Sequence, residues 1–324
     1  MGVRTSGVTA SLLLAVFLST GCDAPLEPES KQEERAAASS PPPSTAPATS
    51  SPAARPAPTS APVPSIEVPK GLEKPQQLDR PRDLGPVLGA DVSWPQCPAG
   101  MGIPLKRSHG APMPIEAARY VIIGLTNGPA FYPNPCLASQ TQWVKDRRLM
   151  AAAYSVISYP EDRHLAAYGG QGPYDGSTRL GALSNVGYQQ ARFNLDTMRK
   201  AGLRSPIVWL DVEPVPDYEW PRDLVANAAV VKGAARGYTD AGLAIGAYST
   251  QALWANVVGG LRLGIPEWRA AGQTSRAEAL RRCGPDRMFQ GGRPVLSQWV
   301  EDGRDQNVTC PGTSVELPRW FHQY

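Results

Sequence analysis

The chain has 324 residues, with 32 lysines and arginines against 29 aspartates and glutamates, which gives a formal net charge of +3. A charge this small, with scattered basic residues, does not indicate a nucleic-acid-binding protein. Residues 86–324 are long enough for one large domain, such as an α/β barrel, and no internal linker divides them. We therefore expect one folded domain and no nucleic-acid partner.

The N-terminal residues 1–22 have the pattern of an export signal. Arg4 gives a positive start, and residues 11–17 form an apolar run that is too short to span a bilayer as a stable helix. Residues 18–22 (Leu-Ser-Thr-Gly-Cys) resemble a bacterial lipobox, in which the cysteine becomes lipid-modified and N-terminal after cleavage. We expect a lipoprotein anchored to a membrane through Cys22. Plain secretion and a short buried segment are the alternatives.

Residues 23–85 are rich in proline, alanine, serine and threonine, and contain almost no aromatic or large aliphatic residues. Such a composition cannot bury enough apolar surface to offset the entropy lost on ordering the chain. Proline-rich linkers stay extended and semi-stiff. We predict a disordered stalk that holds the folded domain away from a membrane surface, with a disordered tail of no spacing role as the alternative.

The folded part, 86–324, alternates apolar runs with helical patterns. Strands are expected at 85–93, 119–126, 149–158, 205–214, 243–248, 268–271 and 294–299, with a short eighth at 308–310. Helices are expected at 135–148, 186–201 and 223–241, and a long glycine-rich loop at 168–176. Strands that alternate with helices predict βαβ units and a parallel sheet. About eight strands favour a single (β/α)8-type barrel, irregular where helices are short or missing.

Four cysteines lie in the folded part. An even number in an exported protein predicts two disulfides. Of the three possible pairings we expect Cys97–Cys136 and Cys283–Cys310, because each pair lies near strand ends that are neighbours in the predicted order. No Cys-x-x-Cys motif occurs and the three histidines are scattered, so we expect no metal site and no cofactor. The aromatic C-terminal segment, 319–324, is expected to pack on the barrel.

The fourth expected strand, 205–214, is an apolar run that ends in Asp211 and Glu213. Side chains at i and i+2 of a strand share a face, so these two acids should lie about 6.6 Å apart. Two acids on one face of a buried strand end repel each other and lose solvation, so one pKa should rise. A protonated acid beside an ionised partner is what cleavage of a glycosidic bond requires. A solvated strand end with two ordinary acids is the alternative.

Other chemically active side chains fall at the expected strand ends, where (β/α) barrels carry their functional sites. Asp91 follows the first strand and Asp305 follows the seventh. Aromatic residues near these ends suit a sugar, because the apolar faces of sugar rings stack on aromatic rings. These aromatic residues are Trp94, Tyr154, Trp209, Tyr248, Trp268 and Trp299. Core packing is the better interpretation for Trp209, which lies within the apolar run.

Several short motifs occur in the order found in family 25 glycoside hydrolases, the bacterial and phage muramidases often called lysozymes. The motifs that resemble that family are Gly-Ala-Asp-Val-Ser at 89–93 followed by Gln96, Leu-Asp-Val-Glu at 210–213, Ile-Gly-Ala-Tyr-Ser at 245–249, Trp-Arg-Ala at 268–270, Ser-Gln-Trp at 297–299 and Asp-Gln-Asn-Val at 305–308. The matches cover nearly all of 86–310. The chain also resembles uncharacterised glycoside-hydrolase-like domains of exported actinobacterial proteins.

The resemblance implies an exported barrel that cleaves the MurNAc–GlcNAc β-1,4 bond of peptidoglycan. It implies that Glu213 is the general acid/base and that Asp211 is its ionised partner, orienting the substrate N-acetyl group or stabilising the cation. Asp91 and Asp305 would complete the acidic floor. The expected substrate-binding residues are Trp94, Gln96, Tyr154, Tyr248, Trp268, Gln298 and Trp299.

Two further expectations concern the reaction and the partners. The separation of about 6.6 Å lies between those of retaining and inverting enzymes, so both routes stay open, as does one assisted by the substrate N-acetyl oxygen. We expect an extracytoplasmic monomer whose partner is peptidoglycan or another envelope glycan. The alternatives are a catalytically weak or inactive barrel that binds envelope glycan and a different sugar hydrolase on the same barrel.

Overall fold

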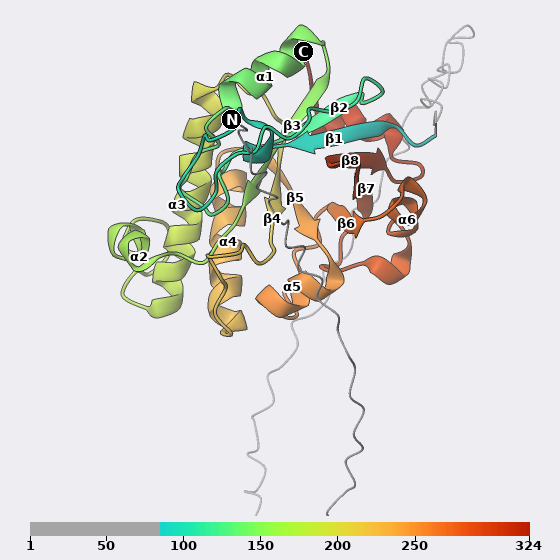
Figure 1. The fold of residues 1–324 in the computed structure, drawn as a ribbon. Helices are drawn as coiled ribbons and strands as arrows, with labels where there is room; N and C mark the ends of the chain where they lie inside the picture. The colour runs from blue at the N-terminus through green and yellow to red at the C-terminus, as the bar shows by residue number, and fades with distance from the viewer. Residues whose placement is uncertain (1–84) are drawn as a thin grey trace, which may run out of the picture. The chain divides into compact units, whose positions relative to one another are not determined.

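The computed structural model describes residues 85–324, so the predicted signal, the lipidation site Cys22 and the stalk lie outside the described residues. Eight strands form a closed barrel (Figure 1). They are β1 (Leu88–Val92), β2 (Tyr120–Gly124), β3 (Met150–Val156), β4 (Ile207–Asp211), β5 (Ala244–Ser249), β6 (Glu267–Gln273), β7 (Pro294–Glu301) and β8 (Arg304–Thr309). Each strand pairs with the next along the chain, and β8 pairs with β1 to close the ring. The predicted α/β barrel is confirmed.

The last strand departs from the predicted parallel arrangement. Strands β1 to β7 are parallel, but β8 runs antiparallel to both β7 and β1. Only Asp302 and Gly303 separate β7 from β8, and a link of two residues can form a hairpin but not a crossover. Both residues have positive φ values, 51° and 68°, as a tight hairpin turn requires. The prediction of a short parallel strand at 308–310 is therefore wrong, since β8 begins at Arg304.

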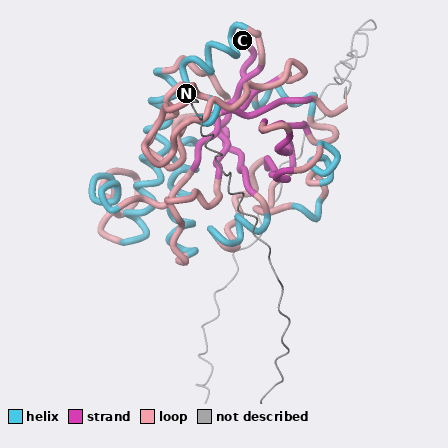
Figure 2. Tube along the Cα trace, in the orientation of Figure 1, coloured by secondary structure: helices cyan, strands magenta, loops and turns pink. Residues whose placement is uncertain are grey.

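Helices surround the strands (Figure 2). They are α1 (Leu137–Asp146), α2 (Asp162–Tyr168), α3 (Arg179–Lys200), α4 (Leu224–Asp240), α5 (Gln251–Val258), α6 (Arg276–Arg281) and α7 (Leu317–Trp320), with short 3-10 helices η1 (Trp94–Gln96), η2 (Pro285–Arg287) and η3 (Ser314–Glu316). Helix α3 begins at 179, not at 186 as predicted, because the Thr178 side chain caps it by accepting from the Gly181 N–H. A further helix, α2, precedes the predicted glycine-rich loop.

Alternate residues of the strands fill two separate cores. On β4, Val208 and Leu210 face outward and pack against the helices, whereas Ile207 and Trp209 face into the barrel. Trp209 is fully buried, which confirms core packing as its role. Gly246 on the neighbouring strand makes room for the Trp209 ring, because a Cβ at this position would overlap it. Large rings inside the barrel therefore depend on a glycine beside them.

The C-terminal segment closes the barrel at the end where β2 begins. Trp320 and Phe321 belong to the interior core, and the Phe321 ring lies 4.7 Å from the ring of Tyr120, the first residue of β2. A last short strand, β9 (His322–Gln323), pairs antiparallel with β3. The expectation that residues 319–324 pack on the barrel is confirmed.

Both predicted disulfides are present. Cys97–Cys136 links the loop after β1 to the residue that precedes α1. Cys283–Cys310 links the segment after α6 to the residue that follows β8. Each bond therefore attaches a long connection to the barrel frame.

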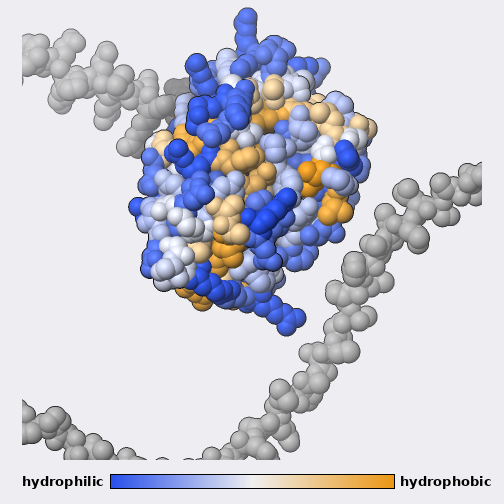
Figure 3. Space-filling view, turned by 90° about the vertical axis from the view of Figure 1, so that its left-hand side faces the viewer, coloured by the Kyte–Doolittle hydropathy of each residue, from blue (hydrophilic) through white to orange (hydrophobic). Residues whose placement is uncertain are grey.

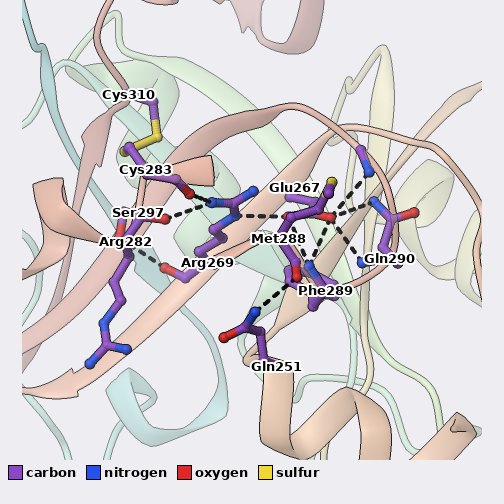
Figure 4. Close-up of polar contacts among 12 residues, drawn as sticks. Gln251, Glu267, Arg269, Arg282, Cys283, Met288, Phe289, Gln290, Ser297 and Cys310 are labelled. Atoms are coloured by element: carbon purple, nitrogen blue, oxygen red, sulfur yellow. Dashed lines mark hydrogen bonds and ion pairs between the residues drawn. A yellow bond between two sulfur atoms is a disulfide. The ribbon is translucent and has the colours of Figure 1, made fainter. Parts of the chain in front are cut away.

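A buried ion pair fixes the long connection between β6 and β7 (Figure 4). Arg269 donates from Nε to Glu267 at 2.7 Å, and both side chains are almost completely buried. Glu267 also accepts from the backbone N–H groups of Phe289, Gln290 and Gly292. Arg269 donates from Nη1 to the carbonyls of Arg282 and Gly284. The segment 282–292 is thus bound to the start of β6 by hydrogen bonds to one charged pair.

The exposed apolar residues of the surface are scattered. Within residues 85–324, six large apolar side chains are exposed, from five separate segments: Leu105, Ile115, Leu180, Leu224, Val225 and Met288. Figure 3 shows hydrophobic residues between hydrophilic ones on the face that it draws. No helix within 85–324 has the length and apolar character needed to cross a membrane. The monomeric state stays a prediction.

Replacing Arg269 with methionine should lower the free energy of unfolding by about 3–5 kcal/mol, because it leaves the Glu267 charge buried without its ionic partner. Urea denaturation followed by circular dichroism measures this change. The matched control is Arg236→Met on α4, whose pair with Asp240 is exposed and contributes little. Equal losses in the two variants would contradict the role given to the buried pair.

Candidate active site

A cavity of about 530 Å³ lies at the end of the barrel where the parallel strands terminate. Its lining combines buried residues such as Asp91 and Asp211 with exposed ones such as Pro214 and Pro216. The cavity therefore reaches from the protein surface into the barrel. This is the end at which the sequence placed the candidate site.

All four predicted acids line this cavity. Asp91 on β1 and Asp211 on β4 lie on inward-facing positions of their strands, and Glu213 follows two residues after β4. Asp305 lies within β8, not in a loop after the seventh strand as predicted. It still reaches the cavity, because an antiparallel strand begins where its partner β7 ends. The hairpin thus supplies the fourth acid.

Asp91 is held by amide groups from two other strands. Gln298 Nε2 on β7 donates to both Asp91 oxygens, at 3.0 and 3.1 Å, and Asn307 Nδ2 on β8 donates at 2.6 Å. Gln298 accepts from the Tyr248 hydroxyl at 2.7 Å, and Asn307 accepts from Trp268 Nε1 at 2.6 Å. The chain of hydrogen bonds connects five strands, β1 and β5 to β8, and surrounds Asp91 with donors that favour its ionised form.

Burial raises the pKa of each of the four acids. The pKa of Glu213 is raised to about 7, by burial first and then by the nearby Asp305 charge. The pKa of Asp211 is raised well above its ordinary value by burial and by the charges of Glu213 and Asp91. The sequence predicted one raised pKa at this pair, whereas the pKa values of both acids are raised.

Asp91 and Asp211 differ in their hydrogen bonds. Burial and the Asp305 charge raise the pKa of Asp91 well above its ordinary value, and the bonds from Gln298 and Asn307 offset only part of this rise. Asp211 Oδ1 is buried and has no hydrogen-bond partner among the described residues. Hydrogen-bond donors therefore stabilise negative charge at Asp91. Asp211 Oδ1 has no such donor among the described residues.

Four of the predicted aromatic residues line the cavity, namely Trp94, Tyr154, Tyr248 and Trp268. The Trp268 ring lies 4.4 Å from the Tyr248 ring and 5.8 Å from the Tyr154 ring. Trp268 and Tyr248 are only 1% and 8% exposed, so they form the floor, whereas Trp94 in η1 is half-buried and presents an accessible ring. Trp94 is thus the best placed to stack on a sugar.

Two predicted substrate-binding residues do not line the cavity. Gln96 turns back on η1, where its Oε1 accepts from the Ser93 N–H at 2.8 Å. Trp299 faces away from the barrel interior and packs against Ala279 and Val308. The reason is strand alternation: Gln298 faces inward, so its neighbour Trp299 must face outward. The assignment of Trp299 to the substrate is wrong.

Sequence reasoning missed two residues of the site. Asn307, two positions after Asp305 on the same face of β8, was visible in the Asp-Gln-Asn-Val motif but was not assigned a role. Lys106 also lines the cavity, from the long loop between β1 and β2. No periodic pattern predicts the course of such a loop. Over residues 85–324, no group of three or more His, Cys, Asp or Glu side chains has the arrangement to hold a metal ion.

Comparison with known proteins gives likenesses in structure alone. No family model and no curated protein matches the sequence. Similar solved structures include a family GH25 lysozyme from Aspergillus fumigatus, at 16% identity and a TM-score of 0.43, covering 72% of this chain and 98% of that one. A bacterial lysozyme from Streptomyces coelicolor is similar at 15% identity and a TM-score of 0.44, over 71% of this chain and 94% of that one.

A third similar structure is the modular autolysin LytC from Streptococcus pneumoniae in complex with a synthetic peptidoglycan ligand. It matches at 12% identity and a TM-score of 0.41, over 69% of this chain and 46% of that one, so this chain spans less than half of its length. Several of these structures are lysozymes or muramidases, the class that the sequence motifs resemble. At these identities and TM-scores, the likeness does not assign an activity to this chain.

Replacing Glu213 with glutamine should make stability less dependent on pH. The pKa of Glu213 is about 7 when folded and about 4.3 in a model peptide, so the folded state binds more protons between these values. The contribution of Glu213 to the free energy of unfolding therefore falls as pH rises from about 4 to 7, and this loss of stability is complete above pH 7. The variant should gain stability over wild type on going from pH 4.5 to 8, on the order of 2 kcal/mol.

Urea denaturation of both proteins at the two pH values measures this gain. The control is Glu219→Gln, since the Glu219 side chain is exposed in the loop before α4. A gain that is the same at pH 4.5 and pH 8 would refute the burial of an ionisable Glu213.

Proposed function

We propose that this chain is an exported glycan hydrolase that cleaves the β-1,4 bond between MurNAc and GlcNAc in peptidoglycan. The observation that carries the proposal is the convergence of four acids in one cavity open to the surface, with the pKa of Glu213 raised to about 7. A carboxyl group that keeps its proton near neutral pH, beside acids able to hold negative charge, is the arrangement of a glycosidase. Aromatic walls suit the sugar rings.

The roles follow from the environment of each acid. Glu213 donates its proton to the glycosidic oxygen as the bond to the anomeric carbon breaks, and later accepts a proton from the water that adds to that carbon. The amide donors around Asp91 favour its ionised form, against the burial that raises its pKa, and positive charge that develops on the sugar favours that form further, so Asp91 stabilises the cationic transition state. Asp211, which lines the same cavity, keeps the expected role of orienting the substrate N-acetyl group.

The envelope location is part of the proposal. Two disulfides suit an oxidising compartment outside the cytoplasm. Export and a lipid anchor at Cys22 rest on the sequence pattern of residues 1–22, which lie outside the described part. The membrane is thus a proposed partner through the anchor, and the wall glycan a proposed partner through the cavity.

Glu213→Gln should lower the rate of peptidoglycan cleavage by about 10²–10⁴-fold, because it removes the proton donor and leaves the shape of the cavity. The loss of turbidity of purified cell walls gives the rate, and mass spectrometry of the products identifies the sugar at each new reducing end. Glu219→Gln serves as the control and should keep wild-type activity. If wild type clears no wall preparation, the hydrolase proposal fails, and co-sedimentation with walls then tests the alternative of a glycan-binding barrel.

The pH profile is a separate test of Glu213 as the acid. Its pKa is raised to about 7, so the protonated form is present below that pH and is lost above it. We expect kcat/KM for wall cleavage to fall as pH rises through about 7. Cleavage rates of soluble glycan fragments between pH 4 and 9 provide the profile. A rate that rises through pH 7 would exclude Glu213 as the general acid.

A further inference from the structure

Lys106 is the one lysine or arginine among the cavity-lining residues of the described chain, and it faces a cavity that holds four acids. Its side chain is only 10% exposed. A glycan that carries carboxylates is repelled by the acids of this cavity and attracted at one place, the Lys106 ammonium. The position of this charge therefore bears on which glycan can enter.

The fold positions Lys106 firmly. The fully buried Asn127, which follows β2, donates from Nδ2 to the Lys106 carbonyl at 3.0 Å. Its Oδ1 accepts from the Ile103 N–H at 2.7 Å, so one amide holds both ends of the turn that carries Lys106. Gly128 leaves room for the Lys106 methylene groups, because a Cβ there would lie 3.1 Å from Lys106 Cγ. The side chain is therefore directed along the cavity wall.

The ammonium group has spare hydrogen-bonding capacity. Its one polar partner between residues 85 and 324 is Asp217, whose Oδ2 lies 3.3 Å away. The Asp217 side chain is 55% exposed, and ion pairs with an exposed partner are weak and easily replaced. A lysine ammonium carries three N–H donors. A second carboxylate can therefore bind without loss of the first.

We infer that Lys106 gives the cavity its selectivity for an anionic glycan, by binding a carboxylate that the substrate carries. This inference rests on the proposed function and deepens it. Asp217 lies in the loop after β4, next to Pro216, which lines the same cavity as Glu213. The carboxylate is thus bound at the wall of the cavity in which the bond is cleaved. In peptidoglycan it belongs to the lactyl group of a peptide-free MurNAc or to a stem peptide.

Binding is measured on the full chain with Glu213→Gln, so that no ligand is consumed. The probes are a GlcNAc–MurNAc tetrasaccharide with free lactyl carboxylates, the same tetrasaccharide with these groups converted to primary amides, and one that bears stem peptides. Isothermal titration calorimetry gives each dissociation constant. We expect a carboxylate-bearing probe to bind about tenfold more tightly than the amide, a preference that added salt reduces. The probe that shows the preference identifies the source of the carboxylate.

Variants assign the preference to Lys106. Lys106→Gln should abolish it, Lys106→Arg should keep it, and Lys232→Gln, an equal change of charge on the exposed face of α4, should keep it. Asp217→Asn removes the negative charge that offsets part of the Lys106 charge and should strengthen the preference, which tests the inference even if Lys106→Gln does not fold. Equal affinity for all probes, or a preference that persists in Lys106→Gln, overturns the inference.

The proposed hydrolase activity is tested separately, by measuring peptidoglycan cleavage with the wild-type chain. Cleavage without a Lys106-dependent preference refutes this inference alone. A Lys106-dependent preference without cleavage refutes the hydrolase and leaves Lys106 as the anchor of a glycan-binding site. Absence of binding by every probe refutes the inference.

Discussion

The buried Asp91 carboxylate imposes the main constraint on this barrel. A charge in the interior needs donors, and here they come from Gln298 on β7 and Asn307 on β8, which receive further bonds from Tyr248 and Trp268. These donors reach Asp91 only if β8 lies between β7 and β1, as the closed ring places it. The stabilisation of the Asp91 carboxylate therefore depends on the closure of the strand ring.

The other three acids, Asp211, Glu213 and Asp305, line the same cavity and lower the stability of the folded protein at neutral pH. Burial raises the pKa of Asp211, Glu213 and Asp305, and nearby acids raise the pKa of Asp211 and of Glu213 further, that of Glu213 to about 7. Charged groups that destabilise a fold at neutral pH persist where function needs them. Lys106 at the cavity wall supplies the opposite charge, and its ion pair is with Asp217, not with any of the four acids.

Contacts around the barrel attach its long connections to the strands. The buried Glu267–Arg269 pair binds the connection between β6 and β7, and the two disulfides attach the loops after β1 and α6. The C-terminal aromatic residues fill the opposite end of the barrel. Each of these contacts joins a connection or a terminus to a strand of the barrel.

The sequence by itself determined the barrel, the pairing of the cysteines and the four acids, because strand periodicity, chain order and residue type are local properties. It also holds a signal for the final hairpin, since Asp302-Gly303 is a dipeptide typical of a two-residue turn. Only the tertiary structure decided that β8 is antiparallel, that Asn307 and Gln298 hold Asp91, and that Trp299 faces outward. It alone brought Lys106 to the cavity, since a loop's course depends on contacts such as Asn127 that are distant in the chain.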